Sequence, residues 1–281
     1  MKLSAELLNI NPQTVENAIT YFVRDSLKKI KGDGIVLGVS GGVDSAVAVA
    51  LSTRAIGKEK VLALFMPEEE TRNEKDYKDI ELLVEEFGFQ LKTVDVTNPL
   101  DTLYDTIPNY DVEDRLSRGN LKARLRMMIL YYYANSGNLV VVGSSDKSEA
   151  MIGYCTKWGD MASDLCPIMD LFKTQVRLLA AHLEIPPAII RKAPTPALWP
   201  GQTAEAEIGL KYEALDLLLY GLEHFMSVDA IAEDLGLAKK KVESIRNRWL
   251  MSEHKRRIPL TTKLAYRTVG RDFRIPWLQD V

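Results

Sequence analysis

Apolar positions along the chain form short continuous runs that alternate with longer amphipathic stretches. The runs with the length of buried strands are 34–39, 61–66, 91–96 and 139–142. Helical periodicity predicts helices over 14–29, 74–87, 120–135 and 171–183. Strands alternating with helices predict an α/β fold: a doubly wound parallel sheet with helices on both faces. We expect a single domain over residues 1–281, with an N-terminal helix and a helical, basic C-terminal tail.

A glycine-rich turn follows the first predicted strand. The run SGGVDS (Ser40–Ser45) lies between the apolar run 34–39 and an apolar helix start at residue 46. A helix that begins there directs free backbone N–H groups into the turn, and glycines let the backbone approach a ligand closely. The turn lacks the Lys of a Walker A motif and offers hydroxyls for phosphate and the Asp44 carboxylate for Mg²⁺. The alternative is an ordinary glycine-rich strand-to-helix turn.

A second turn, GSSDKSE (Gly143–Glu149), repeats this order of apolar strand, glycine, hydroxyls and helix start. Ser145 and Glu149 could serve only as a helix cap and a first-turn acid. Beside the first turn, the second indicates the opposite wall of one nucleotide site. Asp44 and Glu149 then form a carboxylate pair for Mg²⁺.

A third candidate segment is TKWGD (Thr156–Asp160), followed by Asp164 and Lys173. It is too polar for a strand or a core helix, so we expect an ordered loop. A surface loop without function is the alternative.

Composition narrows the class of protein. The net charge of −3 gives no global electrostatic case for nucleic acid or an anionic membrane. The two cysteines, Cys155 and Cys166, are too few for a disulfide framework and are not spaced as zinc ligands. No targeting segment or membrane span is evident, and we expect a cytoplasmic protein.

These motifs resemble those of the ammonia-dependent NAD synthetases, a branch of the N-type ATP pyrophosphatases of the PP-loop superfamily. The resemblance runs from about residue 34 to about residue 259. SGGVDS alone indicates only the superfamily, whereas the full set is specific to this branch. The matching segments are GVSGGVDS (38–45), NLKARLR (120–126), GSSDKSE (143–149), TKWGD (156–160), APT (193–195) and SEHKR (252–256).

The resemblance implies an adenine nucleotide alpha hydrolase-like fold and a reaction in two steps. The nicotinate carboxylate of deamido-NAD attacks the α-phosphate of ATP and releases pyrophosphate, and ammonia then displaces AMP to give NAD. Mg²⁺ would accompany ATP and be held by Asp44 and Glu149. The catalytic residues it implies are Asp44, Lys173 and Asp164, with Asp164 at the nicotinate end, where it could hold ammonium or take a proton.

Binding residues follow from the same match. The ATP contacts it implies are Gly38, Val39, Ser40, Gly41, Gly42, Val43, Asp44, Ser45, Ser144, Lys173 and Thr195. The deamido-NAD contacts it implies are Lys157, Asp164, His254, Lys255 and one of Arg124 and Arg126, a choice that stays open. Ser144 replaces a usual Thr, and Pro196 and Ala204 depart from the pattern in a segment, 196–205, that is typical of a mobile lid.

The resemblance also implies a homodimer, with deamido-NAD bound across the interface. The stripe Leu121, Leu125, Met128, Ile129 and Tyr132 on one helix face is usually core, but here we expect a dimer element. A helix-turn-helix pattern spans 227–249, within a region where Lys and Arg outnumber acids from 239 to 274. We expect two amphipathic helices packed on the sheet edge that deliver His254 and Lys255 to the dinucleotide.

Two other functions are alternatives to a synthetase. A PP-loop ligase or sulfurtransferase that modifies tRNA would need a basic RNA platform and often catalytic cysteines. A nucleotide-sensing, DNA-binding protein would need no second Mg²⁺ carboxylate. The motif begins near residue 40, so we expect no glutaminase domain, and ammonia or a separate glutaminase subunit as the nitrogen source.

Overall fold

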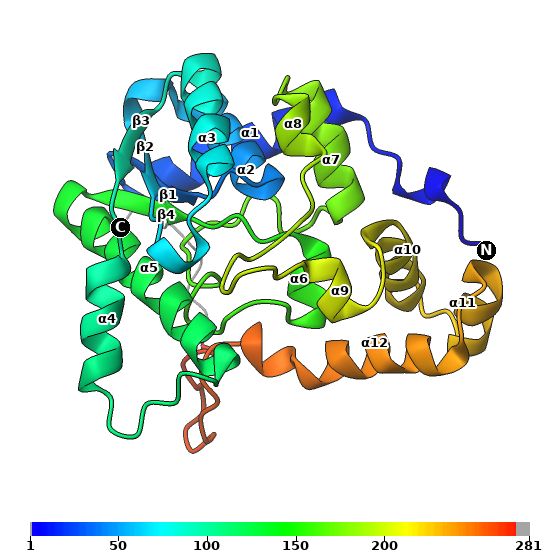
Figure 1. Cartoon of the computed structure of the whole chain (residues 1–281). Coiled ribbons are helices and arrows are strands. Elements are labelled where there is room, and N and C mark those ends of the chain that lie inside the picture. Colours follow the sequence, from blue (N-terminus) through cyan, green and yellow to red (C-terminus); the bar gives the residue numbers. More distant parts are fainter. Residues whose placement is uncertain (1, 274–281) are drawn as a thin grey trace.

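The computed structural model describes residues 2–273. Its four strands form one parallel sheet with the order β3-β2-β1-β4 (Figure 1). The strands are β1 (Gly34–Val39), β2 (Val61–Phe65), β3 (Gln90–Thr93) and β4 (Leu139–Val142). The chain builds the sheet outward from β1 to β3 and then returns to place β4 on the other side of β1. This topology confirms the predicted doubly wound α/β fold.

Helices cover both faces because alternate side chains of each strand point to opposite sides. Ile35 and Leu37 of β1 belong to one hydrophobic cluster, and Val36 between them belongs to another. The first cluster holds residues of α1 (Pro12–Ile30), α2 (Val43–Ile56), α3 (Glu74–Phe87), α7 (Lys173–His182) and α8 (Pro187–Ile190). The second holds residues of α4 (Thr97–Thr106) and α5 (Arg115–Gly137).

α2 is the most deeply buried helix. Residues 46–51 are fully buried, since α2 packs on the sheet with one side and against α1 and α7 with the other. Its alternating Ala and Val residues are small enough for such close packing on all sides. The helix therefore fixes the position of the glycine-rich turn at its N-terminus.

A third hydrophobic cluster lies away from the sheet. It joins α6 (Lys147–Ile152), α9 (Ala204–Ile208), α10 (Tyr212–Glu223), α11 (Val228–Leu235) and α12 (Lys239–Met251). The helix-turn-helix pattern forms α11 and α12, but these helices pack on α10 and α6 rather than on the sheet edge, as Figure 1 shows. The expected docking place was wrong because the buried side chains Ile231, Val242 and Ile245 complete this separate cluster.

Element ends differ from the expected ones where side chains bind the backbone. The third strand ends at Thr93 rather than at residue 96, because Asp95 Oδ1 accepts a hydrogen bond from the Thr97 N–H and α4 follows at once. α7 begins at Lys173 rather than at residue 171, because the Gln175 side chain accepts from the Phe172 N–H. Of the expected basic tail, residues 274–281 lie outside the described residues. Among the described helices, none combines the length and apolar character needed to cross a membrane.

Candidate active site

The site lies where the strand order reverses, between β1 and β4. The glycine-rich turn after β1 and the turn after β4 meet at this edge of the sheet. A crevice outside the carboxyl ends of the strands at such a point is the general place for ligands in open α/β sheets. The topology thus brings together the two segments that the sequence places about a hundred residues apart.

Residues 40–45 form a loop held by its own serines and by a lysine. Ser45 Oγ donates to the Gly42 carbonyl at 3.0 Å and accepts from the Ser40 N–H at 3.2 Å. Gly41 has φ of +71°, and a Cβ there would lie 3.3 Å from the backbone of Asp76, so glycine is needed. Lys192 Nζ donates to the Gly41 carbonyl at 3.0 Å. The first N–H groups of α2, which have no helical partners, are thereby directed into the crevice.

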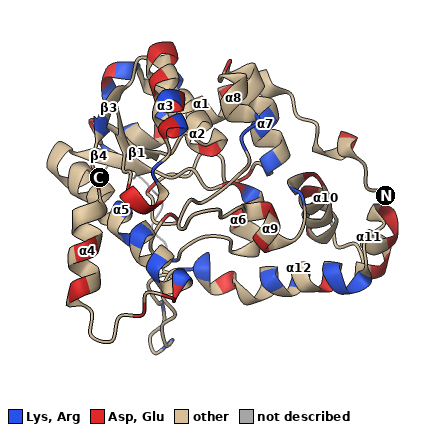
Figure 2. Cartoon of the chain, in the orientation of Figure 1, with Lys and Arg blue, Asp and Glu red and all other residues tan. Residues whose placement is uncertain are grey.

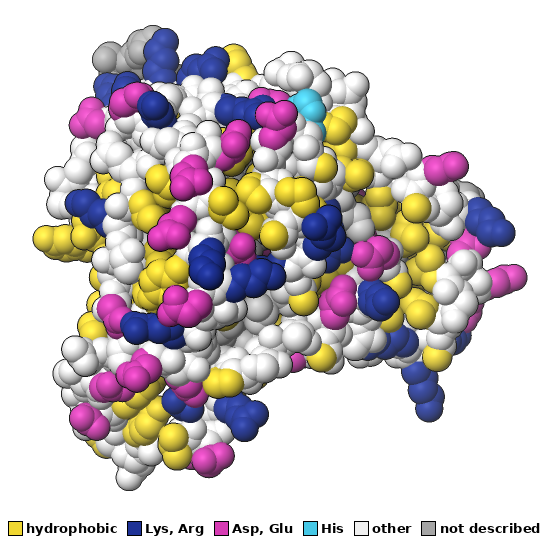
Figure 3. Space-filling view, turned by 45° about the horizontal axis from the view of Figure 1, so that its top comes forward, with side chains coloured by type: hydrophobic (Ala, Val, Ile, Leu, Met, Phe, Trp, Pro, Cys, Tyr) yellow, Lys and Arg dark blue, Asp and Glu magenta, His cyan; other side chains and the backbone are white. Residues whose placement is uncertain are grey.

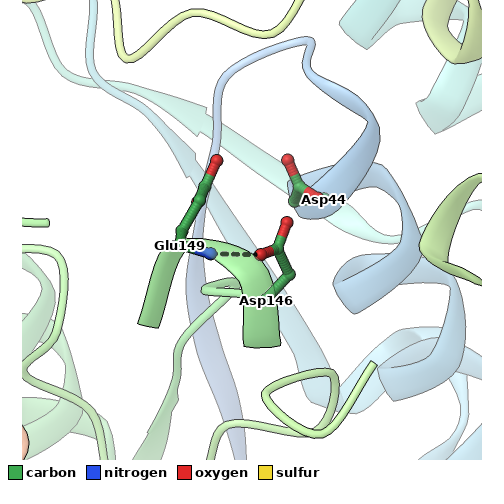
Figure 4. Close-up of side chains that lie close together, drawn as sticks. All are labelled: Asp44, Asp146 and Glu149. Atoms are coloured by element: carbon green, nitrogen blue, oxygen red, sulfur yellow. Dashed lines mark hydrogen bonds between the residues drawn. The ribbon is translucent and has the colours of Figure 1, made fainter. Parts of the chain in front are cut away.

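Three carboxylates from the two turns converge on one point. Ligand oxygens of Asp44, Asp146 and Glu149 all lie within 4.8 Å of one another (Figure 4). Asp146 caps α6 by accepting from the Glu149 N–H at 2.8 Å, which ties it to the backbone of Glu149. Asp44 and Glu149, predicted as a pair, are confirmed as neighbours, and Asp146 joins them.

Lys173 is the cation at the centre of this cluster. Its ammonium lies 2.6 Å from Asp44 Oδ2, 2.7 Å from Asp146 Oδ2 and 3.0 Å from Glu149 Oε1. Burial alone would lower the pKa of Lys173, but the three carboxylates raise it well above the usual value. Burial and the neighbouring Glu149 and Asp44 raise the pKa of Asp146, against the attraction of Lys173. Lys173 is therefore positively charged.

The cluster has the properties of a divalent-cation site. Three carboxylates around one ammonium leave two formal negative charges. Asp44 Oδ1 is buried and has no hydrogen-bond partner among the described residues. Carboxylate oxygens are the ligands that Mg²⁺ prefers, so these residues fit that ion.

A cavity of about 330 Å³ opens beside the cluster. The glycine-rich loop, the Gly143–Ser145 turn and residues 192–198 form its walls, and Ser144 and Thr195 line it. Arg126 also lines it and donates from Nε to the Met66 carbonyl at 3.0 Å. The predicted ATP contacts that line the cavity are Gly38, Val39, Ser40, Gly42, Val43, Asp44, Ser45, Ser144 and Thr195. Two predicted ATP contacts, Gly41 and the fully buried Lys173, are not among the residues that line the cavity.

The segment expected to be a lid forms one wall of the cavity and is tied down. Buried Lys122 donates to the Leu198 carbonyl at 2.8 Å and pairs with Glu68 and, at 2.7 Å, with Glu70. Gln202 Oε1 accepts from the Leu198 N–H at 2.9 Å. The lid is therefore attached to α5 and to the end of β2 through one lysine.

The residues predicted to contact deamido-NAD lie outside this cavity, except Arg126. Arg124 is exposed and donates to the Lys157 carbonyl, so these two lie together on the outer surface. Lys255 Nζ donates to the carbonyls of Gly153 and Cys155, and His254 beside it is exposed. The TKWGD segment is the ordered loop that was expected: Asp160 accepts from the Thr156 N–H at 2.6 Å.

Asp164 also lies apart from the cavity. Its Oδ1 accepts from the Tyr131 hydroxyl at 3.1 Å and its Oδ2 from the Val141 N–H at 2.8 Å. In the structure it fastens the end of β4 to α5, and its catalytic role stays a prediction.

Sequence reasoning missed four residues that shape the site: Asp146, Lys122, Lys192 and Tyr212. Asp146 had a signal, since it stands inside the second motif at a helix-cap position. Tyr212 donates to Glu149 Oε1 at 2.9 Å, and burial raises its pKa, so the phenol stays a donor. Lys122 stands inside the NLKARLR segment and Lys192 directly before APT, so both had a signal in the sequence, whereas Tyr212, on a distant helix, had none.

Together the parallel α/β sheet and the crevice between β1 and β4 are typical of enzymes that use nucleotides. The model of the NAD synthase family matches residues 15–259. The chain is 42% identical over 255 residues to the NH(3)-dependent NAD(+) synthetase of Hyperthermus butylicus, covering 90% of this chain and 92% of that protein. The chain therefore belongs to the NAD synthase family.

Solved structures agree with this assignment. NMN synthetase from Francisella tularensis has a TM-score of 0.80 at 31% identity and covers 91% of this chain and 100% of its own. The glutamine-dependent NAD+ synthetase from Acinetobacter baumannii, solved in complex with ADP, has a TM-score of 0.67 at 26% identity. The match covers 95% of this chain but 49% of the Acinetobacter chain.

The buried cation generates a stability prediction. Lys173→Met should lower the free energy of unfolding by about 3–5 kcal/mol at pH 7, because the carboxylates lose their only buried counter-charge within the cluster. The pKa of Asp146, already raised above its unfolded value, should rise further. A carboxyl with a raised folded pKa contributes stability at low pH that is lost as pH rises through that pKa, so lowering the pH to 5 should restore part of the loss. Urea unfolding at both pH values measures this.

Lys147→Met is the matched control for this variant. Lys147 pairs with Asp170, which is 98% exposed, and with Glu223, so its removal should cost less than about 1 kcal/mol. Equal losses in the two variants would contradict the account of the cluster.

Proposed function

We propose that this chain is a ligase that synthesises NAD from deamido-NAD, ATP and ammonia, with AMP and pyrophosphate as the other products. NH3-dependent NAD synthetase activity follows from membership of the family. The observation that best supports this reaction is that the strand-to-helix turns after β1 and β4 meet beside one cavity. Asp44, Glu149 and Lys173 lie together at that point.

In the first step the carboxylate of deamido-NAD attacks the α-phosphorus of ATP, and the bond to the pyrophosphate oxygen breaks. Negative charge then develops on phosphate oxygens. The N–H groups at the start of α2, with Lys173 and Arg126, are positive groups placed to stabilise that charge. ATP is assigned to the cavity because the loop 38–45, Ser144 and Thr195 line or adjoin it.

Asp44, Asp146 and Glu149 would hold Mg²⁺, which when bound neutralises phosphate oxygens. We assign this set on the orphaned Asp44 Oδ1 and on the excess negative charge of the cluster. Asp146 enlarges the pair expected from the sequence to three ligands. Lys173 pairs with all three carboxylates, so its positive charge and that of the ion would together offset their negative charges.

Arg124 and Arg126, between which the sequence did not choose a deamido-NAD contact, lie in different places. Arg126 faces the cavity, where the adenylate forms, whereas Arg124 lies beside Lys157 on the outer surface. We assign Arg124 to the deamido-NAD side with Lys157, His254, Lys255 and Asp164. In the second step ammonia attacks the acyl carbon, AMP leaves, and the extra proton passes to a nearby base, for which Asp164 remains our proposal.

A second candidate acceptor is the deamido form of nicotinamide mononucleotide. The fold similarity to an NMN synthetase favours it, with a TM-score of 0.80. The two acceptors share the nicotinate carboxylate and differ in the adenylyl half, so the same chemistry serves either.

Surface charge gives little support to nucleic-acid binding. In Figure 2, Lys and Arg run along α12, but its partner in the helix-turn-helix pattern, α11, carries acids. On the face in Figure 3, basic and acidic side chains are interspersed. A recognition surface for DNA or RNA would instead gather one sign of charge.

A homodimer is also part of the proposal. On α5, Leu116 is 67%, Met128 61% and Tyr132 69% exposed, which is unusual for large apolar side chains on one helix. Leu125, which the sequence placed in the same stripe, instead belongs to the protomer core at 9% exposure. Leu121 and Ile129 are half-buried, so Met128 and Tyr132 are the exposed members of the stripe and remain candidates for the interface.

The first test supplies ATP, Mg²⁺ and deamido-NAD with either ammonium or glutamine, and measures AMP and NAD. Ammonium should support turnover and glutamine should not. A glutaminase nucleophile needs a thiol with a lowered pKa, whereas burial raises the pKa of both Cys155 and Cys166 to about 12. A parallel reaction with the deamido mononucleotide ranks the two acceptors. Equal rates of NAD formation with glutamine and with ammonium would contradict the assignment of ammonia as the nitrogen source.

The second test concerns the metal ligands. Asp44→Asn and Glu149→Gln should each slow pyrophosphate release by at least about a hundredfold, because charge on the leaving group is left under-neutralised in the transition state. The double variant should lose less than the product of the two, since both residues act on one ion. Pyrophosphate release without ammonia isolates this step. Near-normal release by Asp44→Asn would remove Asp44 from the metal site.

The third test concerns assembly. Tyr132→Asp should convert a dimer into monomers, because a buried charge at an interface is strongly unfavourable. Phe225→Asp is the control, since Phe225 is 96% exposed but follows α10 rather than lying on α5. Light scattering measures the mass, and activity is assayed on the same samples. A Tyr132→Asp dimer would show that this face of α5 is not the interface.

A further inference from the structure

We propose that Tyr212 is a positioning residue for the carboxylate of Glu149, holding one of its oxygens so that the other is presented to the metal ion. The role of that ion rests on the proposed function. Tyr212 belongs to α10, outside all the motifs of the sequence, and its side chain is fully buried.

Two donors from different helices meet on the same Glu149 oxygen. The Tyr212 hydroxyl donates to Oε1 at 2.9 Å, and Lys173 Nζ donates to it at 3.0 Å. No hydrogen bond to Glu149 Oε2 is found among residues 2–273. The carboxylate is thus fixed through Oε1 alone, which leaves Oε2 available as a ligand.

The phenol ring supports the cation as well as the carboxylate. Lys173 Nζ lies 5.1 Å from the centroid of the Tyr212 ring, within the range of a cation–π contact. The ring therefore limits the movement of Lys173, and the hydroxyl limits the movement of Glu149.

α10 makes further hydrogen bonds to the site through Asp216, one helical turn after Tyr212. Asp216, also fully buried, accepts from the Ser148 hydroxyl at 2.5 Å and from the Thr174 N–H at 2.8 Å. These partners adjoin Glu149 and Lys173 in sequence. Residues four apart share one helix face, so a single face of α10 holds the starts of both α6 and α7. The Tyr212 hydroxyl consequently has a defined position relative to Glu149.

The same tyrosine is linked to the last residue of the lid segment 196–205. Its N–H donates to Glu205 Oε1 at 3.1 Å, and Glu205 lies on α9. The backbone of Tyr212 is therefore fixed from the lid side and its hydroxyl from the metal side.

Tyr212→Phe removes the hydroxyl and keeps the ring. The probe is Mn²⁺ alone, titrated into the intact protein without nucleotide and followed by electron paramagnetic resonance. We expect Mn²⁺ to bind about tenfold more weakly, the size of effect typical of a lost partner of a metal ligand. The Mg²⁺ concentration for half-maximal pyrophosphate release should rise by a similar factor, while the KM for deamido-NAD should stay unchanged.

Tyr220→Phe is the matched control. Tyr220 lies on the same helix two turns on and stacks on His224, with ring centroids 4.0 Å apart. The Tyr220→Phe variant should bind Mn²⁺ with the same affinity as the unaltered protein. Because Tyr212→Phe can also lower the thermal midpoint by a few degrees, the rise of that midpoint with added Mg²⁺ is a second measurement of metal binding by the folded fraction.

Unchanged Mn²⁺ affinity in Tyr212→Phe, or an unchanged Mg²⁺-dependent rise of its thermal midpoint, would overturn the proposal. Equal weakening in Tyr212→Phe and Tyr220→Phe would do so too, because it would show a general loosening of α10. These results are independent of NAD synthesis: an unaltered protein that binds Mn²⁺ but makes no NAD contradicts the proposed function and leaves the role of Tyr212 open to the same titration.

Discussion

The site depends on one buried ammonium. Lys173 has no exposed surface and pairs with three carboxylates that come from two different strand-to-helix turns. Without a cation between them, the like charges of Asp44, Asp146 and Glu149 would repel one another in a poorly solvated place. The lysine therefore allows the two turns to approach closely enough to form one site. Under the proposed function a divalent cation would add to this balance, because the cluster carries more negative than positive formal charge.

The rest of the fold holds this cluster in place. α2, packed on all sides, carries Asp44 at its start, and α7 carries Lys173 at its start. At their far ends both helices are tied to α1, where Glu16 accepts from Arg54 at 2.8 Å and lies 2.8 Å from His182. α10 secures the other side through Tyr212 and Asp216. Hydrogen bonds from several helices thus hold the buried charged groups close to their partners, which offsets the free-energy cost of burying them.

The residues proposed for adenylation and those proposed to bind deamido-NAD lie in different places. The groups that we propose for adenylation line or adjoin the cavity, whereas Arg124, Lys157, His254 and Lys255 lie outside it. Under the proposed function, recognition of the acceptor would therefore be separate from the phosphate chemistry. Such a separation would let relatives of one fold, with an NAD(+) synthetase and an NMN synthetase among them, differ in the nucleotide that they produce.

The strands, most of the helices, the two turns and the pairing of Asp44 with Glu149 could be predicted from the sequence, because they follow from local periodicity and from the order of strand, glycine and helix. Three features emerged only from the packed fold: Asp146 joins the carboxylate pair, Leu125 is core, and α11 and α12 pack away from the sheet. Tyr212 was beyond sequence reasoning because it lies outside every motif, and nothing in the local pattern of α10 indicates that its hydroxyl reaches Glu149, 63 positions away. Lys122 stands inside the NLKARLR segment, but that segment does not indicate its pairing with Glu68, 54 positions away.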